Sequence, residues 1–313
     1  LVFQSIDLSQ SGKTIDSMAV LGAEGTYYMS EKNIYVATET DAWRKTKISR
    51  YSYEKGTIKY ACEKVINGTI LNQFSMDEYE GNLRFAATTY DDNGKTTNGL
   101  YIVDSSFKTI GSVSRLAPGE RIYSARFMGE SVYFVTYRET DPLFLVDVSD
   151  PANPVVKDKL KIPGFSDYLH PFGENMLLGI GSIQDKEGNS YVKLSMFDIS
   201  NPEKVKEIHS KKLEKNTVQN IGSDHKGIVV DAERNRIAFG VENYGDTPDS
   251  FYEIFSYDKQ KGFQNIAKLS LEESYSTESR GLYIGDYFYL CKTSSGICVY
   301  DTKKYKKIRS IAY

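Results

Sequence analysis

The amino-acid sequence predicts an all-β protein, a β-propeller built from four-stranded antiparallel blades. Three observations predict it. A turn phrase, clearest as Phe144-Leu-Val-Asp-Val-Ser-Asp-Pro151, recurs along the chain. The copies are 43 to 60 residues apart, a spacing typical of architectures with one blade per repeat. The composition favours strands, with 24 Tyr in 313 residues, and no helical pattern of useful length is present.

In each copy of the turn phrase, a short apolar run ends in an acidic residue and a turn signal follows. The acidic residues are Asp7, Glu54, Asp104, Asp147, Asp198, Asp258 and Asp301, with Glu54 in a degenerate copy. A carboxylate can accept a hydrogen bond from the backbone two residues further on, and proline cannot continue a central strand. We therefore expect each copy to mark the turn between the third and fourth strands of a blade.

The first two strands of each blade precede its turn phrase as a strand, a tight turn and a second strand. The example is Arg121–Gly129 followed by Ser131–Tyr137. Equivalent pairs are 26–30 with 33–37, 74–79 with 82–86, 168–173 with 175–179, 225–230 with 236–240, and 281–285 with 287–290. The three longest loops, 91–99, 183–190 and 242–249, are predicted to join second and third strands.

These patterns predict a single β-propeller domain over residues 1–313. Residues 1–24 supply a half blade and residues 25–313 supply six blades, which gives about seven blade positions with the first incomplete. The chain starts at Leu1 in mid-strand, and we interpret it as a piece of a longer precursor. A full-length ring could therefore hold eight blades. Circular closure would remove the exposed sheet edges of so many strands.

Composition limits the partners. The net charge of −3 favours neither nucleic acid nor an anionic membrane. No apolar run approaches the roughly 20 residues of a membrane helix, so no membrane insertion is expected from this segment. Cys291 and Cys298 flank a predicted hairpin, where a disulfide or two separate thiols are both open, and we favour separate thiols.

The first strand of each propeller blade lines a central channel, so polar residues on or near these strands and on the adjoining loops are candidates for ligand binding. They are Arg126, Arg138, Asp141, Asp167, His170, Asp224, His225 and Arg280. Guanidinium groups suit carboxylate or phosphate ligands, and histidine changes its charge near neutral pH. The alternative is that these charges pair between blades, as Arg126 with Asp167 and Arg280 with Asp224. His209 falls on an outer strand and is expected to have no site role.

Other chemistries lack the required patterns. The histidines are not at the spacing of a built-in metal site, and the Asp91 and Asp185 loops look more like turns than calcium loops. No Gly-x-Ser-x-Gly elbow and no dinucleotide loop is present. We therefore expect no metal and no cofactor.

Three segments, Arg115–Gly129, Thr140–Pro154 and Ile162–Asn175, resemble a bacterial and archaeal family of secreted β-propeller domain proteins of uncharacterised function. The resemblance implies an extracellular or cell-surface location and further blades upstream, and it supplies no reaction. His225 is followed by Lys-Gly where relatives tend to carry an aromatic residue, so the resemblance assigns it no shared role.

The leading functional hypothesis is a non-catalytic module that binds a protein, peptide or cell-wall glycan at the loop face or in the channel. Tyr90 and Tyr244 would suit such recognition. The alternative is a hydrolase or lyase with His170 or His225 as general base and Arg126 or Arg280 holding an anionic substrate. A third hypothesis is a structural spacer between other modules.

Overall fold

The computed structural model describes residues 1–10, 12–40, 44–91, 93–137, 141–201, 203–245, 248–271, 278–293 and 296–312. The chain forms two compact units. The first holds residues 1–139 and 143–159, and the second holds 140–142 and 160–313. In the described ranges all regular structure is β-strand apart from three short 3-10 segments, and none of it is a helix long and apolar enough to span a membrane.

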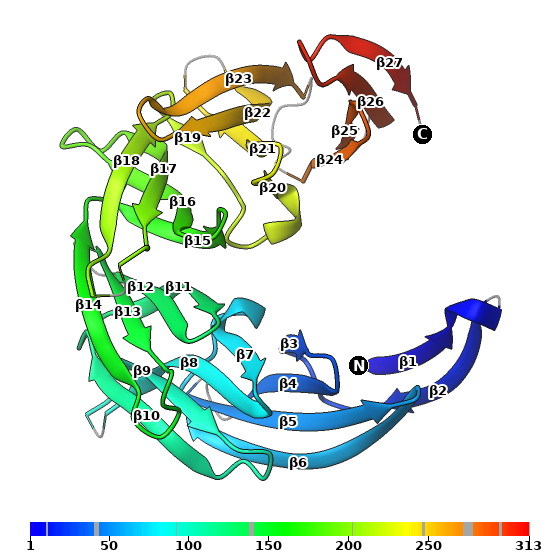
Figure 1. Cartoon of the computed structure of the whole chain (residues 1–313), viewed down its shortest axis with the longest axis vertical. Coiled ribbons are helices and arrows are strands. Elements are labelled where there is room, and N and C mark those ends of the chain that lie inside the picture. The colour runs from blue at the N-terminus through cyan, green and yellow to red at the C-terminus, as the bar shows by residue number, and fades with distance from the viewer. Residues whose placement is uncertain are drawn as a thin grey trace. The chain divides into compact units, whose positions relative to one another are not determined.

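The first unit begins with a two-stranded sheet of β1 (Val2–Asp7) and β2 (Lys13–Ala19) (Figure 1). Three antiparallel four-stranded sheets follow, each made from four consecutive strands. The first of them is β3 (Thr26–Met29), β4 (Asn33–Thr40), β5 (Lys45–Glu54) and β6 (Thr57–Asn67). The second is β7 (Met76–Tyr79), β8 (Asn82–Tyr90), β9 (Thr96–Val103) and β10 (Thr109–Leu116). The third is β11 (Arg121–Met128), β12 (Ser131–Tyr137), β13 (Asp141–Asp147) and β14 (Val155–Ile162).

The second unit contains three more antiparallel sheets (Figure 1). One is β15 (Phe165–Pro171), β16 (Met176–Gln184), β17 (Ser190–Asp198) and β18 (Lys206–Lys212). The next is β19 (Thr217–Val218), β20 (Val229–Asp231), β21 (Arg236–Asn243), β22 (Asp249–Asp258) and β23 (Gly262–Ser270). The last is β24 (Arg280–Ile284), β25 (Tyr287–Lys292), β26 (Gly296–Asp301) and β27 (Lys307–Ile311).

The sheets confirm the predicted fold class. Residues 1–24 form two strands of an incomplete blade, and six blades follow. The three loops at 91–99, 183–190 and 242–249 do join second and third strands, although Thr96–Gly99 of the first loop already belongs to β9. The arrangement of all blades in one closed domain stays a prediction.

Two predicted first strands begin later than expected. Residues 74–79 open with the 3-10 segment η2 (Gln73–Ser75), so strand β7 starts only at Met76. Residues 225–230 open with the 3-10 segment η3 (His225–Gly227), and the inner strand of this blade is split. Its two pieces, β19 and β20, both pair with β21, and ten residues between them leave the sheet.

The turn between the third and fourth strands has the predicted chemistry. The Oδ1 atom of Asp147 accepts a hydrogen bond from the backbone N–H of Ser149 at 2.9 Å, and Asp198 does the same with Ser200 at 2.9 Å. Asp7, Asp104, Asp258 and Asp301 make equivalent bonds two residues on. The bond from Ser149 holds the pKa of Asp147 below its usual value because it stabilises the carboxylate. The aspartate of the recurring phrase therefore stabilises the turn by accepting a hydrogen bond from the backbone.

Burial follows strand position within each blade. The second strands β8, β12, β16 and β21 carry runs of consecutive buried residues, whereas the outer strand β18 alternates between exposed and half-buried positions. Runs of this kind are expected where both faces of a sheet are covered. In the first unit, Leu100 and Ile102 of one blade share a core with Val132, Phe134 and Phe144 of the next. In the second unit, Tyr252 and Ile254 pack in one cluster with Phe288 and Leu290. Blades are thus held together face to face by apolar contact.

Paired isoleucine substitutions will test this burial pattern. Ile254 of β22 is 0% exposed, and Ile266 of the adjoining strand β23 is 40% exposed. We expect Ile254→Ala to lower the free energy of unfolding by about 2 to 5 kcal/mol, because it leaves a cavity between two blades. Ile266→Ala should cost less than about 1 kcal/mol. Urea unfolding measures both, and equal losses would contradict blade-to-blade burial as the main stabilising contact.

Candidate functional site

The predicted polar candidates divide between the two units. Arg126 lies on β11 of the first unit, with its guanidinium carbon 4.1 Å from the ring centroid of Phe74 in η2. Arg138 lies outside the described residues, and for Asp141 only the backbone, in β13, is described. The other five candidates belong to the second unit. That all eight residues gather around one central channel stays a prediction.

The split inner strand of the β19–β23 blade contacts the blades on both of its sides. The ten residues that leave the sheet carry Gln219, Asp224 and His225. Gln219 Nε2 donates to Asp167 Oδ2 of β15 at 2.8 Å, while its Oε1 accepts from the backbone N–H of Ile221 at 2.6 Å. The segment that interrupts the inner strand therefore bonds, through Gln219, a carboxylate of the preceding blade.

On the other side, Asp224 reaches the following blade. Its Oδ2 lies 2.6 Å from an Arg280 guanidinium nitrogen, with side-chain exposures of 24% and 37%. Arg280 also donates to the backbone carbonyls of Glu278 and Ser279. The predicted pairing of Arg280 with Asp224 is confirmed as a contact between blades. The other predicted pair, Arg126 with Asp167, would join the two units and stays a prediction.

The histidines are engaged within the second unit. His170 and Tyr168 stand two residues apart on β15, and His170 Nδ1 lies 2.8 Å from the Tyr168 hydroxyl. His225 opens η3 rather than a strand. His209 lies on the outer strand β18, where Nδ1 is 2.8 Å from the Tyr257 hydroxyl of the next blade.

Asp167 is a titratable group of the second unit whose pKa is shifted toward neutrality. Burial raises the pKa of its carboxyl to about 6, and the hydrogen bond from Gln219 offsets only part of that rise. A carboxyl with a pKa near neutrality can give and take protons at physiological pH, which is the property of a general acid or base. Within the described part of the chain, however, the Asp167 carboxylate is bonded by the side-chain amide of Gln219, a group of the protein itself.

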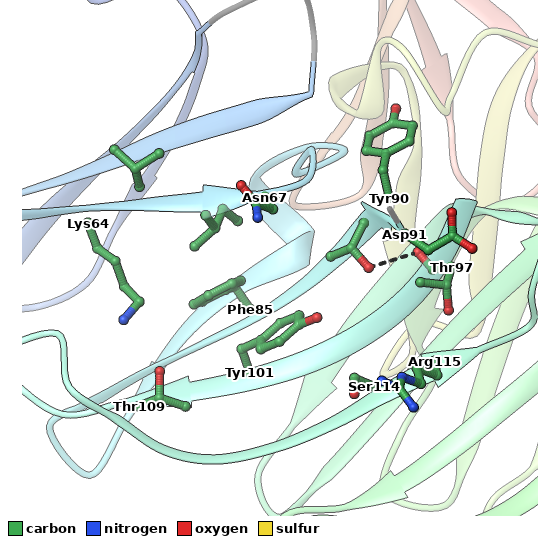
Figure 2. A pocket seen from close by; sticks show the side chains of 13 residues that line it. Lys64, Asn67, Phe85, Tyr90, Asp91, Thr97, Tyr101, Thr109, Ser114 and Arg115 are labelled. Carbon is green, nitrogen blue, oxygen red and sulfur yellow. Dashed lines mark hydrogen bonds between the residues drawn. The ribbon is translucent and has the colours of Figure 1, made fainter. Parts of the chain in front are cut away.

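A groove that the sequence did not identify lies in the first unit, with a cavity volume of about 470 Å³. It lies between the outer strand β6 of one blade and strands β8, β9 and β10 of the next (Figure 2). The rings of Phe85 and Tyr101, which face each other across β8 and β9, stack with centroids 5.4 Å apart. Phe85 is buried and Tyr101 is half-buried, so Tyr101 is the exposed layer of the pair.

Charged and hydroxyl groups surround this aromatic pair. Lys64 and Thr109 lie on one side of it in Figure 2, and Ser114 and Arg115 lie on the other. Lys64 Nζ donates to the Phe107 carbonyl at 3.0 Å and keeps two further N–H donors. The groove can therefore present cations and hydroxyls around a flat apolar surface.

The loop end of the groove carries Tyr90, which the sequence had marked for recognition. The guanidinium carbons of Arg44 and Arg121 lie 5.6 and 5.9 Å from its ring centroid. Asp91, an acidic residue of the lining, accepts backbone N–H bonds from Asn93 and Lys95 at its Oδ1. The same geometry at Asp185, which accepts from the N–H groups of residues 187 and 189, confirms both acidic loops as turns.

The cysteines are separate thiols. Cys291 is opposite Ile297, and Cys298 is opposite Leu290, so successive register positions place the two side chains on different faces of the blade. This confirms the interpretation we favoured over a disulfide.

Replacing the buried carboxyl of Asp167 should change the pH dependence of stability. Its pKa is 3.8 in the unfolded reference and about 6 in the fold, so the folded state holds the proton more tightly. Its contribution is most favourable below pH 3.8 and is lost as the pH rises through about 6. Asp167→Asn, which keeps an acceptor for Gln219, should raise the free energy of unfolding at pH 7.5 by about 2 kcal/mol.

Urea unfolding between pH 3 and pH 8 measures this effect. Asp185→Asn is a control of opposite sign, because hydrogen bonding, chiefly from Asn189, lowers the pKa of Asp185 to about 2. Its contribution is present above the unfolded pKa and is lost as the pH falls toward 2. An Asp167→Asn protein that is less stable than the parent at pH 7.5 would show that the carboxylate is stabilised in the fold.

Two relatives match the chain in sequence. An uncharacterized protein of Methanocaldococcus jannaschii is 47% identical over 150 residues, which is 47% of this chain and 24% of that protein. An uncharacterized protein of Archaeoglobus fulgidus is 34% identical over 285 residues, which is 91% of this chain and 41% of that protein. The chain thus spans less than half the length of these relatives.

Two solved structures share the fold. Proteins of Bacteroides uniformis and Bacteroides fragilis, both provisionally described as 6-phosphogluconolactonases, align with TM-scores of 0.52 and 0.51. The alignments cover 94% and 96% of this chain and 86% of each of those chains, at 11% and 12% identity. Such identities show the fold alone. The model of the β-propeller domain family matches residues 1–305, and the chain belongs to this family.

Proposed function

We propose that this chain is a non-catalytic binding module of an extracellular or cell-surface protein. The observation that carries the proposal is the contrast between the two units. In the second, the candidate acid–base groups are held by protein partners, as in the contacts of Asp224 with Arg280 and of Asp167 with Gln219. In the first, a groove of about 470 Å³ presents aromatic, hydroxyl and cationic groups. A volume of this size is typical of ligand pockets.

The ligand is a protein, a peptide or a glycan that contacts the groove at the loop side of the β7–β10 blade. Loops and strand ends on a rigid scaffold are where binding residues concentrate. Tyr90 lies at this end, between two arginines, and aromatic residues with polar tips are enriched at recognition sites. The extracellular location is supported by the family resemblance of the sequence.

A second candidate function is hydrolysis, and Asp167 is the observation that favours it. Its pKa of about 6 suits a general acid or base, and the fold is shared with proteins provisionally described as lactonases. In that case Asp167 and His170 on β15 would act on a substrate, and Gln219 would have to release the carboxylate.

Substitutions in the two units separate these functions. We expect a His170→Ala/His225→Ala double variant to keep full binding on an array of immobilised glycans and peptides. Tyr90→Ala should reduce binding roughly tenfold, because it removes the aromatic surface at the loop end. Retention on the array is measured beside hydrolysis of 6-phosphogluconolactone. Lactone hydrolysis that disappears in Asp167→Asn would overturn the proposal in favour of the enzyme.

A further inference from the structure

We propose that the groove between β6 and the β8–β10 face binds an acidic glycan, with the ring of a uronic-acid sugar on Tyr101 and its carboxylate on Arg115. The inference rests on the proposed binding function and names the class of ligand. It is carried by the backbone around Arg115, by the charges of the groove and by the side chains that line it.

Arg115 is held in a strained backbone conformation. Its φ is +61°, in the left-handed region that side chains other than Gly, Asn and Asp rarely adopt. It lies at an irregularity of β10, where the register with β9 shifts between Val113 and Leu116. A bulge of this kind turns residues out of the ladder and re-aims their side chains. Both residues within the shift, Ser114 and Arg115, are exposed and line the groove.

A buried amide maintains the strain. Asn98 of β9 is 0% exposed, and its Nδ2 donates to the carbonyls of Leu116, Ala117 and Glu120 at 3.2 to 3.3 Å. Its Oδ1 accepts from the Thr88 hydroxyl at 2.9 Å. Backbone strain persists only where the surroundings over-determine it, and it concentrates at functional sites. The network fixes the segment that follows Arg115 and thereby restrains the backbone from which its side chain extends.

The charge of the groove selects an anion. Lys64 and Arg115 line it, Arg44 and Arg121 lie near the Tyr90 ring at its end, and Asp91 is the one acidic residue among the described residues of its lining. This local excess of positive charge occurs in a chain whose net charge is −3. Arg115 has no hydrogen-bond or ion-pair partner among the residues that the structure describes. A planar guanidinium fork matches the two oxygens of a carboxylate.

The side chains of the groove suit a sugar. Strand β8 is hydrogen-bonded to β7 and β9, and β9 is bonded to β8 and β10, so the aromatic floor offers a ligand its side chains, whereas β6 and β10 on either side are edge strands. The lining includes the Asn67 amide, the hydroxyls of Thr109 and Ser114, and the ring of Tyr101. Hydroxyls and amides can bond to sugar hydroxyls, and an aromatic ring offers a flat apolar surface to a sugar face.

The test titrates the whole chain with oligogalacturonate in a calorimeter. The matched ligand is the same oligomer with its carboxylates methyl-esterified, which keeps the rings and removes the charge. We expect the acidic oligomer to bind roughly tenfold or more tightly than the ester, the range of one charge-assisted hydrogen bond. Added salt should weaken its binding, because exposed charges are screened.

Arg115→Asn is the informative variant because asparagine tolerates a positive φ. It should keep or raise the thermal midpoint and weaken oligogalacturonate binding roughly tenfold. Lys59→Gln is the matched control, since it removes an exposed charge from the same strand as Lys64 but outside the groove lining, and should leave binding unchanged.

Other results of the titration would contradict the proposal in different ways. Equal affinity for the acid and its ester, or absence of binding, would overturn the acidic glycan and leave the binding module standing. A further result would be that poly-glutamate binds as tightly as oligogalacturonate and loses its binding in Arg115→Asn. That result would replace the glycan with an acidic peptide as the ligand. Shortening of the oligomer during the titration, seen by mass spectrometry, would overturn the non-catalytic function itself.

Discussion

The structure depends on the burial of the middle strands of each blade on both faces. Residues such as Val132 and Phe134 of β12 are fully buried, and they are buried against the neighbouring blade as well as within their own. A four-stranded sheet with two apolar faces is not stable alone in water, since each exposed face would leave large side chains solvated. Within each unit the blades therefore stack, and every other feature is placed by that stacking.

Stacking has different consequences at the inner and outer strands. At the inner strands of the second unit, polar groups of adjacent blades meet and satisfy one another, as Asp167 does with Gln219. Near the outer strands of the first unit, Ile66 of β6 still packs on the core, but the side chains beyond it do not fill the space above Tyr101. A groove remains there because the outer strand β6 alternates half-buried and exposed positions along the groove and covers its neighbour only in part.

The two sites differ in how their charges are supported. Asp224 and Arg280 neutralise each other, which orders a blade contact and leaves little charge for a ligand. Arg115 is supported instead through its backbone, by the buried Asn98 network. A charge that is positioned by its backbone keeps its side-chain donors for another molecule. We place ligand binding in the first unit because the side-chain donors of Arg115 remain available there, whereas those of Arg280 are engaged by Asp224.

The sequence by itself determined the blades and their turns, because the signals are local. An aspartate that bonds the N–H group two residues on, as at Asp147, acts within one turn and needs no distant partner. The same locality made the Asp91 and Asp185 loops readable as turns. Strand starts at 74–79 and 225–230 were misplaced, because a 3-10 segment and a strand have similar apolar content over such short lengths.

Only the tertiary structure decided the candidate sites. Lys64, Tyr101 and Arg115 come from two blades and three strands, and nothing in their spacing indicates that they share a groove. Arg115 lies in a bulge, and Asn98 bonds the carbonyl of Leu116 directly after it. Neither the bulge nor this contact could be recognised from the residue types alone. The raised pKa of Asp167 likewise follows from burial against another blade. Local hydrogen bonds depend on residues that are adjacent in the sequence. The burial of a side chain, and the meeting of distant residues in one site, depend instead on how neighbouring blades pack.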